Sequence, residues 1–87
     1  MTVTAEQCRF VLNAMFIEAS RDELPFIEVN SGTLHRTLGD YPGPNHRMPT
    51  VCDVMWSEHN PSHGDQILSQ PENRKGAKLT VRFVLPR

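Results

Sequence analysis

Residue types that could hold a metal gather in one stretch of the sequence, between positions 46 and 63. The candidate ligands in this stretch are His46, Cys52, Asp53, His59 and His63. The four-residue step from His59 to His63 would place two imidazoles on one side of a helix, but Pro61 breaks such a helix. The short cysteine pairs of common zinc folds are also missing. We therefore predict no metal site and no cofactor.

A cysteine nucleophile would need an exposed thiolate beside an imidazole, for which Cys52 and His46 are the candidates. Cys52 lies in an apolar sequence with Val51, Met55 and Trp56, which should raise its pKa and leave it inert. The glycines do not form a phosphate-binding loop. The sequence therefore predicts a protein that is not an enzyme.

Both cysteines, Cys8 and Cys52, fall on apolar stripes, which favours buried, reduced thiols; a disulfide stays possible. No secretory segment precedes them, and no apolar run approaches the ~20 residues that span a bilayer. We expect a cytoplasmic protein with no membrane partner.

Eighty-seven residues suffice for one domain, which we expect to span residues 1–87. Charge is unevenly distributed along it. Residues 1–30 carry two basic and five acidic side chains, a net charge of −3, whereas residues 31–87 carry seven basic and five acidic ones, a net charge of +2. The second part could face a polyanion, although the overall net charge of −1 makes this a modest signal.

Three helices are predicted from capping residues and apolar spacing. Thr4 and Gln7 fit a capping box that opens a helix from Ala5 to Ser20. A second helix, Thr33 to Leu38, would be capped by Asn30 or Ser31 and closed by Gly39 in the left-handed conformation. Leu34 and Leu38 would then face inward, and His35, Arg36 and Thr37 would lie on the other sides.

The third predicted helix ends near Glu58 and has the clearest amphipathic pattern. Its inward side repeats at steps of three and four residues through Met48, Val51, Cys52, Met55 and Trp56. Asn45 is the expected cap, with Pro49 in the first turn. The residues left outward are His46, Arg47, Thr50, Asp53, Val54 and Ser57.

Two strands, Gln66 to Ser69 and Leu79 to Leu85, form a predicted C-terminal hairpin, and the second alternates apolar and polar residues. Between them lies a polar tip that carries Arg74, Lys75 and Lys78. The short run Phe26 to Val29 could pair as a third strand beside this hairpin. The predicted fold class is α+β, with three helices and an antiparallel hairpin.

This order of helices and strands resembles the winged helix-turn-helix fold over essentially the whole chain. The turn between the second and third helices, from Asp40 to Asn45, is longer than the usual three or four residues. The resemblance implies binding of double-stranded DNA, with the third helix in the major groove and the hairpin tip on the backbone. The residues expected to contact DNA are then Arg36, His46, Arg47, Thr50, Arg74, Lys75 and Lys78.

The alternative is a protein-interaction module, because winged helices also serve as adaptors and dimerisation domains. The near-neutral charge favours this interpretation. The strand from Phe26 to Val29 could offer an edge to a partner, and a half-buried Trp56 could anchor an interface. The partner would be another protein or a second copy of the chain.

Overall fold

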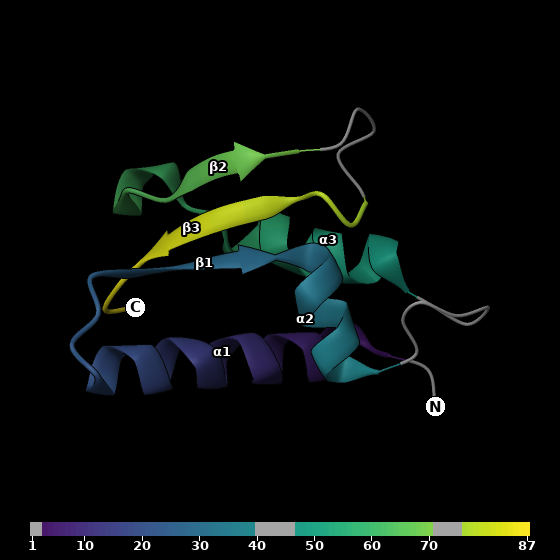
Figure 1. The fold of residues 1–87 in the computed structure, drawn as a ribbon, viewed down its shortest axis with the longest axis horizontal. Helices are drawn as coiled ribbons and strands as arrows, with labels where there is room; N and C mark the ends of the chain where they lie inside the picture. Colours follow the sequence, from purple (N-terminus) through teal and green to yellow (C-terminus); the bar gives the residue numbers. More distant parts are fainter. Residues whose placement is uncertain (1–2, 40–46, 71–75) are drawn as a thin grey trace.

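The computed structural model describes residues 3–39, 47–70 and 76–87. Within these residues the chain forms three α-helices, one short 3-10 helix and three strands, so the predicted α+β fold class is confirmed (Figure 1). The elements follow in the order α1 (Ala5–Arg21), β1 (Phe26–Asn30), α2 (Ser31–Leu38), α3 (Met48–Glu58), η1 (Pro61–His63), β2 (Gln66–Ser69) and β3 (Thr80–Val84).

Helix α1 begins at the predicted capping box. The Gln7 N–H donates to the Thr4 hydroxyl at 3.2 Å, and the Thr4 N–H donates to the Gln7 side-chain oxygen at 3.0 Å. The helix ends one residue later than predicted, at Arg21, and Glu23 then takes a positive φ of 59° that turns the chain toward β1. Its inward face buries Cys8, Leu12, Phe16 and Ala19.

The three strands form one antiparallel sheet in the order β1-β3-β2. The predicted hairpin, β2 with β3, and the predicted third strand, β1, are both confirmed. β3 is the central strand and pairs with β1 on one side and β2 on the other. Burial alternates along β3 as the sequence indicates: Val81 and Phe83 are fully buried, whereas Thr80, Arg82 and Val84 are half-buried. Of the flanking residues, Leu79 is fully buried and Leu85 is 7% exposed. This alternation directs one face of the sheet to the core and the other to solvent.

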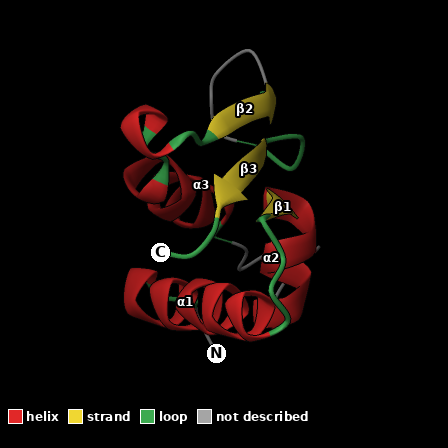
Figure 2. Ribbon diagram, turned by 90° about the vertical axis from the view of Figure 1, so that its left-hand side faces the viewer, coloured by secondary structure: helices red, strands yellow, loops and turns green. Residues whose placement is uncertain are grey.

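The hydrophobic core lies between the inner face of the sheet and the helices. In Figures 1 and 2, α1 lies furthest from β2; Figure 2 shows α3 to one side of the sheet and α2 next to β1. The Phe16 ring of α1 meets the Phe83 ring of β3 edge-on, with centroids 5.0 Å apart. This aromatic contact joins the first helix of the chain to its last strand.

Several predictions about α2 and α3 are wrong. Helix α2 is capped by Asn30, one of the two predicted caps, but it starts at Ser31, two residues early, and Gly39 has φ 106° and ψ 174°, which is not left-handed helical. His35 is fully buried instead of facing outward. In α3 the cap is Arg47, without a side-chain capping bond; Asn45 lies outside the described residues.

Val54 is also placed wrongly by the sequence pattern, because it is 1% exposed instead of outward-facing. The template of three- and four-residue steps assigns a narrow inward stripe to α3. The helix packs against both α1 and α2, so a wider arc of its surface is buried. Met48, Val51, Cys52 and Met55 are buried as predicted, and Trp56 is half-buried.

Cys8 and Cys52 are buried, reduced thiols, as predicted. Burial raises the pKa of Cys8 to about 11, with the neighbouring Cys52 adding to the rise and Arg9 opposing it. A thiol in this state is a poor nucleophile.

Among the described residues, the longest helix is the 17-residue α1, and none combines the length and apolar character needed to cross a membrane.

A buried carboxylate, Asp65, ties the end of the chain to the turn before β2. It accepts hydrogen bonds from the Asn60 N–H, the Val84 N–H and Arg87 Nη1, each at 2.8 Å. Arg87 Nη2 donates in turn to the Glu58 carbonyl at 2.6 Å. This set of contacts, the Asp65 clamp, joins the end of α3, the η1 turn and the end of β3.

Candidate functional site

Four of the seven residues predicted to contact DNA lie in the described part of the chain. Arg36 on α2 and Lys78, just before β3, are exposed, as is Arg47 at the start of α3. Thr50, one turn into α3, is half-buried. The remaining three residues, His46, Arg74 and Lys75, lie outside the described residues.

The N-terminus of α2 holds the arm of the hairpin that leads into β3. The Asn30 side-chain nitrogen donates to the Ala77 carbonyl at 3.0 Å and to the Thr80 hydroxyl at 3.1 Å. Its oxygen accepts from the Thr33 N–H at 3.0 Å, which caps α2. One amide side chain therefore fixes both the start of the helix and the residues on either side of Lys78.

Two further contacts strengthen this junction. The Ser31 N–H donates to the Leu79 carbonyl at 2.8 Å, and the Ser31 hydroxyl donates to the Gly76 carbonyl. At Gly32 the helix backbone lies so close to the arm that an added Cβ would meet both the Cβ and the carbonyl oxygen of Ala77 at 3.2 Å. A residue without a side chain is what permits this approach.

The middle of α2 fixes the start of α3. His35 is completely buried, and its Nε2 accepts a hydrogen bond from the Arg47 N–H at 2.8 Å. This bond satisfies one of the amides that a helix start leaves without an intrahelical partner, in place of a side-chain cap. Arg36 follows His35 directly in α2. The helix therefore positions the backbone at Arg47 and Lys78 and itself carries Arg36.

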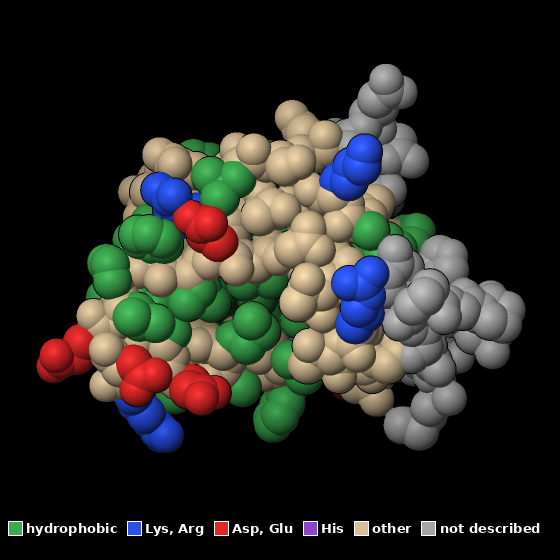
Figure 3. Space-filling model, viewed as in Figure 1, with side chains coloured by type: hydrophobic (Ala, Val, Ile, Leu, Met, Phe, Trp, Pro, Cys, Tyr) green, Lys and Arg blue, Asp and Glu red, His purple; other side chains and the backbone are tan. Residues whose placement is uncertain are grey.

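We call these three cations, Arg36, Arg47 and Lys78, the basic end of the molecule. In Figure 1, α2 ends, α3 begins and β3 begins on the same side of the fold, opposite the C-terminal end of α1. Figure 3 shows basic groups over α2 and near the start of β3, whereas acidic side chains gather around the end of α1. The last residues of α1 and the turn that follows carry Glu18, Asp22 and Glu23 against one base, Arg21. That end of the fold is therefore acidic on balance, whereas Arg36, Arg47 and Lys78 lie toward the other end.

The exposed side of α3 is short and mixed in charge. Among its described residues it offers Pro49, Asp53 and Ser57, with Thr50 half-buried beside them and Arg47 at the start. Val54, predicted to face outward, is not available to a partner. The part of α3 suited to contact with an anion is therefore its first turn.

Two further cations, Arg82 and Arg87, form ion pairs and aromatic contacts among the described residues. Arg82 donates to Glu28 through Nε at 3.0 Å and Nη2 at 2.7 Å, and its guanidinium lies 4.3 Å from the centre of the Phe26 ring. Arg87 belongs to the Asp65 clamp, with its guanidinium against the aromatic rings of the core. Both are engaged away from the basic end.

The histidines named as possible metal ligands have other contacts. His59 caps the end of α3, and its ring meets the Trp56 ring edge-on with centroids 6.1 Å apart. His63 Nε2 lies 3.1 Å from the Val84 carbonyl oxygen and 3.0 Å from that of Pro86. Within residues 3–39, 47–70 and 76–87, no three His, Cys, Asp or Glu side chains are grouped as metal ligands would be.

Replacing Asn30 by alanine should lower the free energy of unfolding by about 2–3 kcal/mol, because the helix cap and the hydrogen bonds to the hairpin arm are lost together. Asn30→Ser keeps a capping oxygen but is too short to reach Ala77, so it should lose about half as much. Urea unfolding of both variants measures this. Equal stability of Asn30→Ala and the natural protein would contradict the junction described above.

Sequence reasoning named the cations but missed the residues that position them. Asn30 was named only as a cap, and Ser31, Gly32 and His35 were given no part in the site. The signal available was the unusual run Asn30–Gly32, in which small polar residues follow a strand directly and could approach another backbone. What they approach, the arm beginning at Gly76, is distant in sequence and could not be read from the pattern.

A comparison of the chain with protein-family models, curated proteins and solved structures found no match.

Proposed function

We propose that this chain is a domain of winged-helix type that binds double-stranded DNA through the basic end. The observation that supports the proposal is the junction made by α2, which places Arg36, Arg47 and Lys78 on one side of the fold while the acids near the end of α1 lie at the other. Such a separation orients a polyanion toward one face even when the net charge is near zero.

The cations have different roles in this proposal. Arg36 and Lys78, exposed on α2 and the hairpin arm, suit contacts to phosphates, which set the position of a protein on the duplex. Arg47 and Thr50, at the first turn of α3, suit base edges in the major groove: arginine can bind guanine O6 and N7, and threonine can contact a thymine methyl. His46, Arg74 and Lys75, which the resemblance also implies as DNA contacts, lie outside the described residues.

Fluorescence anisotropy with a labelled random duplex at low salt tests the proposal. Arg36→Ala and Lys78→Ala should each weaken binding and lower the slope of log affinity against log salt by about one, since each removes one phosphate contact. The matched control is Arg9→Ala, which removes an exposed charge of the same sign from α1. It should leave both the affinity and the slope near those of the natural protein.

The double variant Arg74→Ala with Lys75→Ala extends the test to the hairpin tip and should weaken binding further. The proposal fails if the natural protein binds the duplex no better than in the millimolar range. It also fails if Arg9→Ala weakens binding as much as Arg36→Ala, because a diffuse charge effect would then explain the data.

A protein-binding module is the second candidate, and a different observation favours it. Phe10 and Ile17, two turns apart on α1, are 77% and 55% exposed, and exposed apolar patches mark protein-interaction sites. The two features expected from the sequence are weaker. Trp56 is half-buried against His59, and the Phe26 ring on β1 is partly covered by Arg82.

A further inference from the structure

The outer face of α1 carries two of the most exposed apolar side chains among the described residues. Phe10 is 77% and Ile17 55% exposed, ahead of Leu24 at 46%, Leu68 at 42% and Phe26 at 38%. Phe10 and Ile17 are seven residues apart, two turns of the same helix, so both point the same way. Ala14 lies between them, four residues after Phe10 and three before Ile17, and is also exposed.

This face points directly away from the core. The buried residues of α1, among them Cys8, Leu12 and Ala19, occupy the opposite side of the helix. Figures 1 and 2 both show α1 as an outermost layer, with the described elements on only one side of it. Folding of a single chain therefore leaves the stripe Phe10–Ala14–Ile17 in water.

The charges at the two ends of this stripe identify what could cover it. Glu6 precedes Phe10 by four residues, and Arg21 follows Ile17 by four residues, so each charge lies one turn beyond its apolar neighbour. Phe10 and Ile17 lie at equal distances in sequence from the midpoint between Asn13 and Ala14, and so do Glu6 and Arg21. The stripe is therefore symmetric in its apolar positions and opposite in charge at its two ends. Both end residues are exposed, and neither forms an ion pair with another described residue.

We propose that a second copy of this chain covers the stripe, with the two α1 helices packed antiparallel about a two-fold axis near Asn13 and Ala14. Reversing one helix about that axis sets Phe10 against Ile17 of the second copy and Glu6 against its Arg21, and each contact occurs twice. The small Ala14 at the axis allows the 8–10 Å approach of packed helices. This arrangement specifies the partner of the second candidate function and does not depend on DNA binding.

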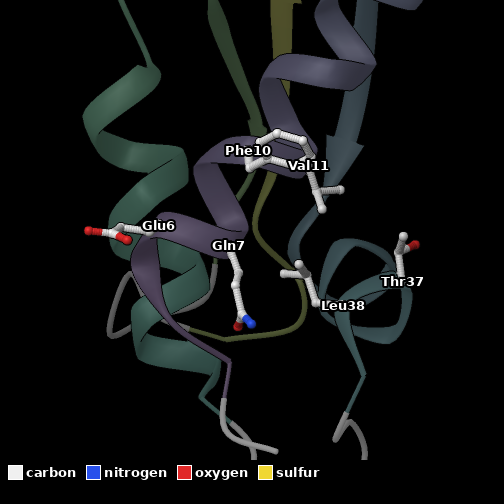
Figure 4. Close-up of a pocket in the computed structure, with 6 residues that line it drawn as sticks. All are labelled: Glu6, Gln7, Phe10, Val11, Thr37 and Leu38. Atoms are coloured by element: carbon white, nitrogen blue, oxygen red, sulfur yellow. The ribbon is translucent and has the colours of Figure 1, made fainter.

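A groove beside Phe10 gives room for the second copy. It has a volume of about 530 Å³ and is lined by Glu6, Gln7, Phe10, Val11, Thr37 and Leu38. Figure 4 shows Val11 of α1 and Leu38 of α2 pointing toward each other, with Phe10 beside them. In the paired arrangement Ile17 of the second copy would lie over this apolar space. One helix pair is a small interface, so we expect association in the micromolar range.

Sedimentation equilibrium or light scattering across the micromolar range measures the association. The natural protein should pass from the 9.9 kDa monomer to a species of twice that mass as concentration rises. Phe10→Asp and Ile17→Asp should each weaken association at least tenfold. The matched control is Leu68→Asp on β2, which places the same charge at a similarly exposed leucine and should leave association unchanged.

Charge reversal tests the antiparallel arrangement itself. Glu6→Arg and Arg21→Glu should each weaken self-association, because like charges then meet at both ends of the helix pair. Mixing these two variants should restore a dimer containing one of each, since every end then joins opposite charges. Thermal unfolding of each variant shows that the fold is kept.

The proposal is overturned if the natural protein stays monomeric throughout, or if Leu68→Asp disrupts the dimer as much as Phe10→Asp does. A dimer that survives both charge reversals, with no gain on mixing, would rule out the antiparallel pairing. DNA titration of Phe10→Asp separates this inference from the proposed function, because the substitution leaves the basic end unchanged. A monomeric variant that still binds the duplex supports both proposals as independent. A variant that stays dimeric contradicts the helix pair, whatever its affinity for DNA.

Discussion

Asp65→Asn is expected to lower the free energy of unfolding by about 3 kcal/mol, because it removes the charge that accepts three hydrogen bonds and leaves one of the donors without an acceptor. The Asp65 side chain is completely buried, and the side chain of Arg87, its partner at 2.8 Å, is 15% exposed. An asparagine could present its oxygen to Val84 and Arg87, but its amide nitrogen would then face the Asn60 N–H, and two donors would meet.

Urea unfolding measures this loss, which is a large share of the roughly 5–15 kcal/mol typical of a whole domain. The matched control is Glu28→Gln, which breaks the exposed ion pair with Arg82. That substitution should cost about 1 kcal/mol or less, because water screens the pair. If the two substitutions cost the same, the Asp65 clamp does not hold the C-terminal end as described.

Acid should weaken the protein through the same carboxylate. Burial alone would raise the pKa of Asp65, but hydrogen bonds from Arg87 and from the Val84 and Asn60 amides outweigh it and hold the pKa below its usual value. The folded chain therefore keeps this carboxylate charged at a pH where the unfolded chain binds a proton. Its contribution is complete above the unfolded pKa of about 3.9 and is lost as the pH falls through the lower, folded pKa.

A pH series of urea unfolding checks this direction. The difference in stability between the natural protein and Asp65→Asn should be constant near neutral pH and should shrink below about pH 4. If this difference in stability instead grew on acidification, folding would raise the pKa of Asp65. That result would contradict the stabilisation of the carboxylate by its three hydrogen-bond donors.

Val54→Asp should cost about 4 kcal/mol or more, because it buries a carboxylate at a position that is 1% exposed in the tightly packed α3. The periodic pattern of the sequence places Val54 outward, where the same change would cost at most about 0.5 kcal/mol. The experiment therefore separates the structure from the sequence-based expectation. Thermal or urea unfolding of the purified variant is the measurement.

Two further variants keep this test informative if Val54→Asp fails to fold. Val54→Thr preserves the shape and buries only a hydroxyl, so it should fold and lose about 1–2 kcal/mol. Ser57→Asp, one turn later on the exposed side of α3, should have almost no effect. Near-neutral results for all three would show that Val54 faces solvent.

The elements of this fold could be predicted because their signals are local. The capping box at Thr4, the alternation along β3 and the proline at the first turn of α3 each concern residues within one element, and each matched the structure to within a residue or two. The third strand at Phe26 also followed from a short β-prone run. Local propensity and binary pattern agree in these segments.

The errors concern residues whose surroundings come from elsewhere in the chain. His35 is polar and lies one residue from an inward leucine, so its sequence context predicts exposure; its burial follows from the Arg47 amide, twelve residues away. Val54 is buried because α3 packs against two helices and not one. The positions of Arg36 and Lys78 at a common end likewise required the junction of α2 with the hairpin arm.

The contact between Gly32 and Ala77 has a consequence for how this protein can diverge. Two positions 45 residues apart share one small space, so a larger side chain at either would need a smaller one, or a shifted backbone, at the other. Descendants of this sequence should therefore change these positions together or keep both small. Correlated substitution at positions 32 and 77 in related sequences would indicate that the close contact between α2 and the hairpin arm is kept.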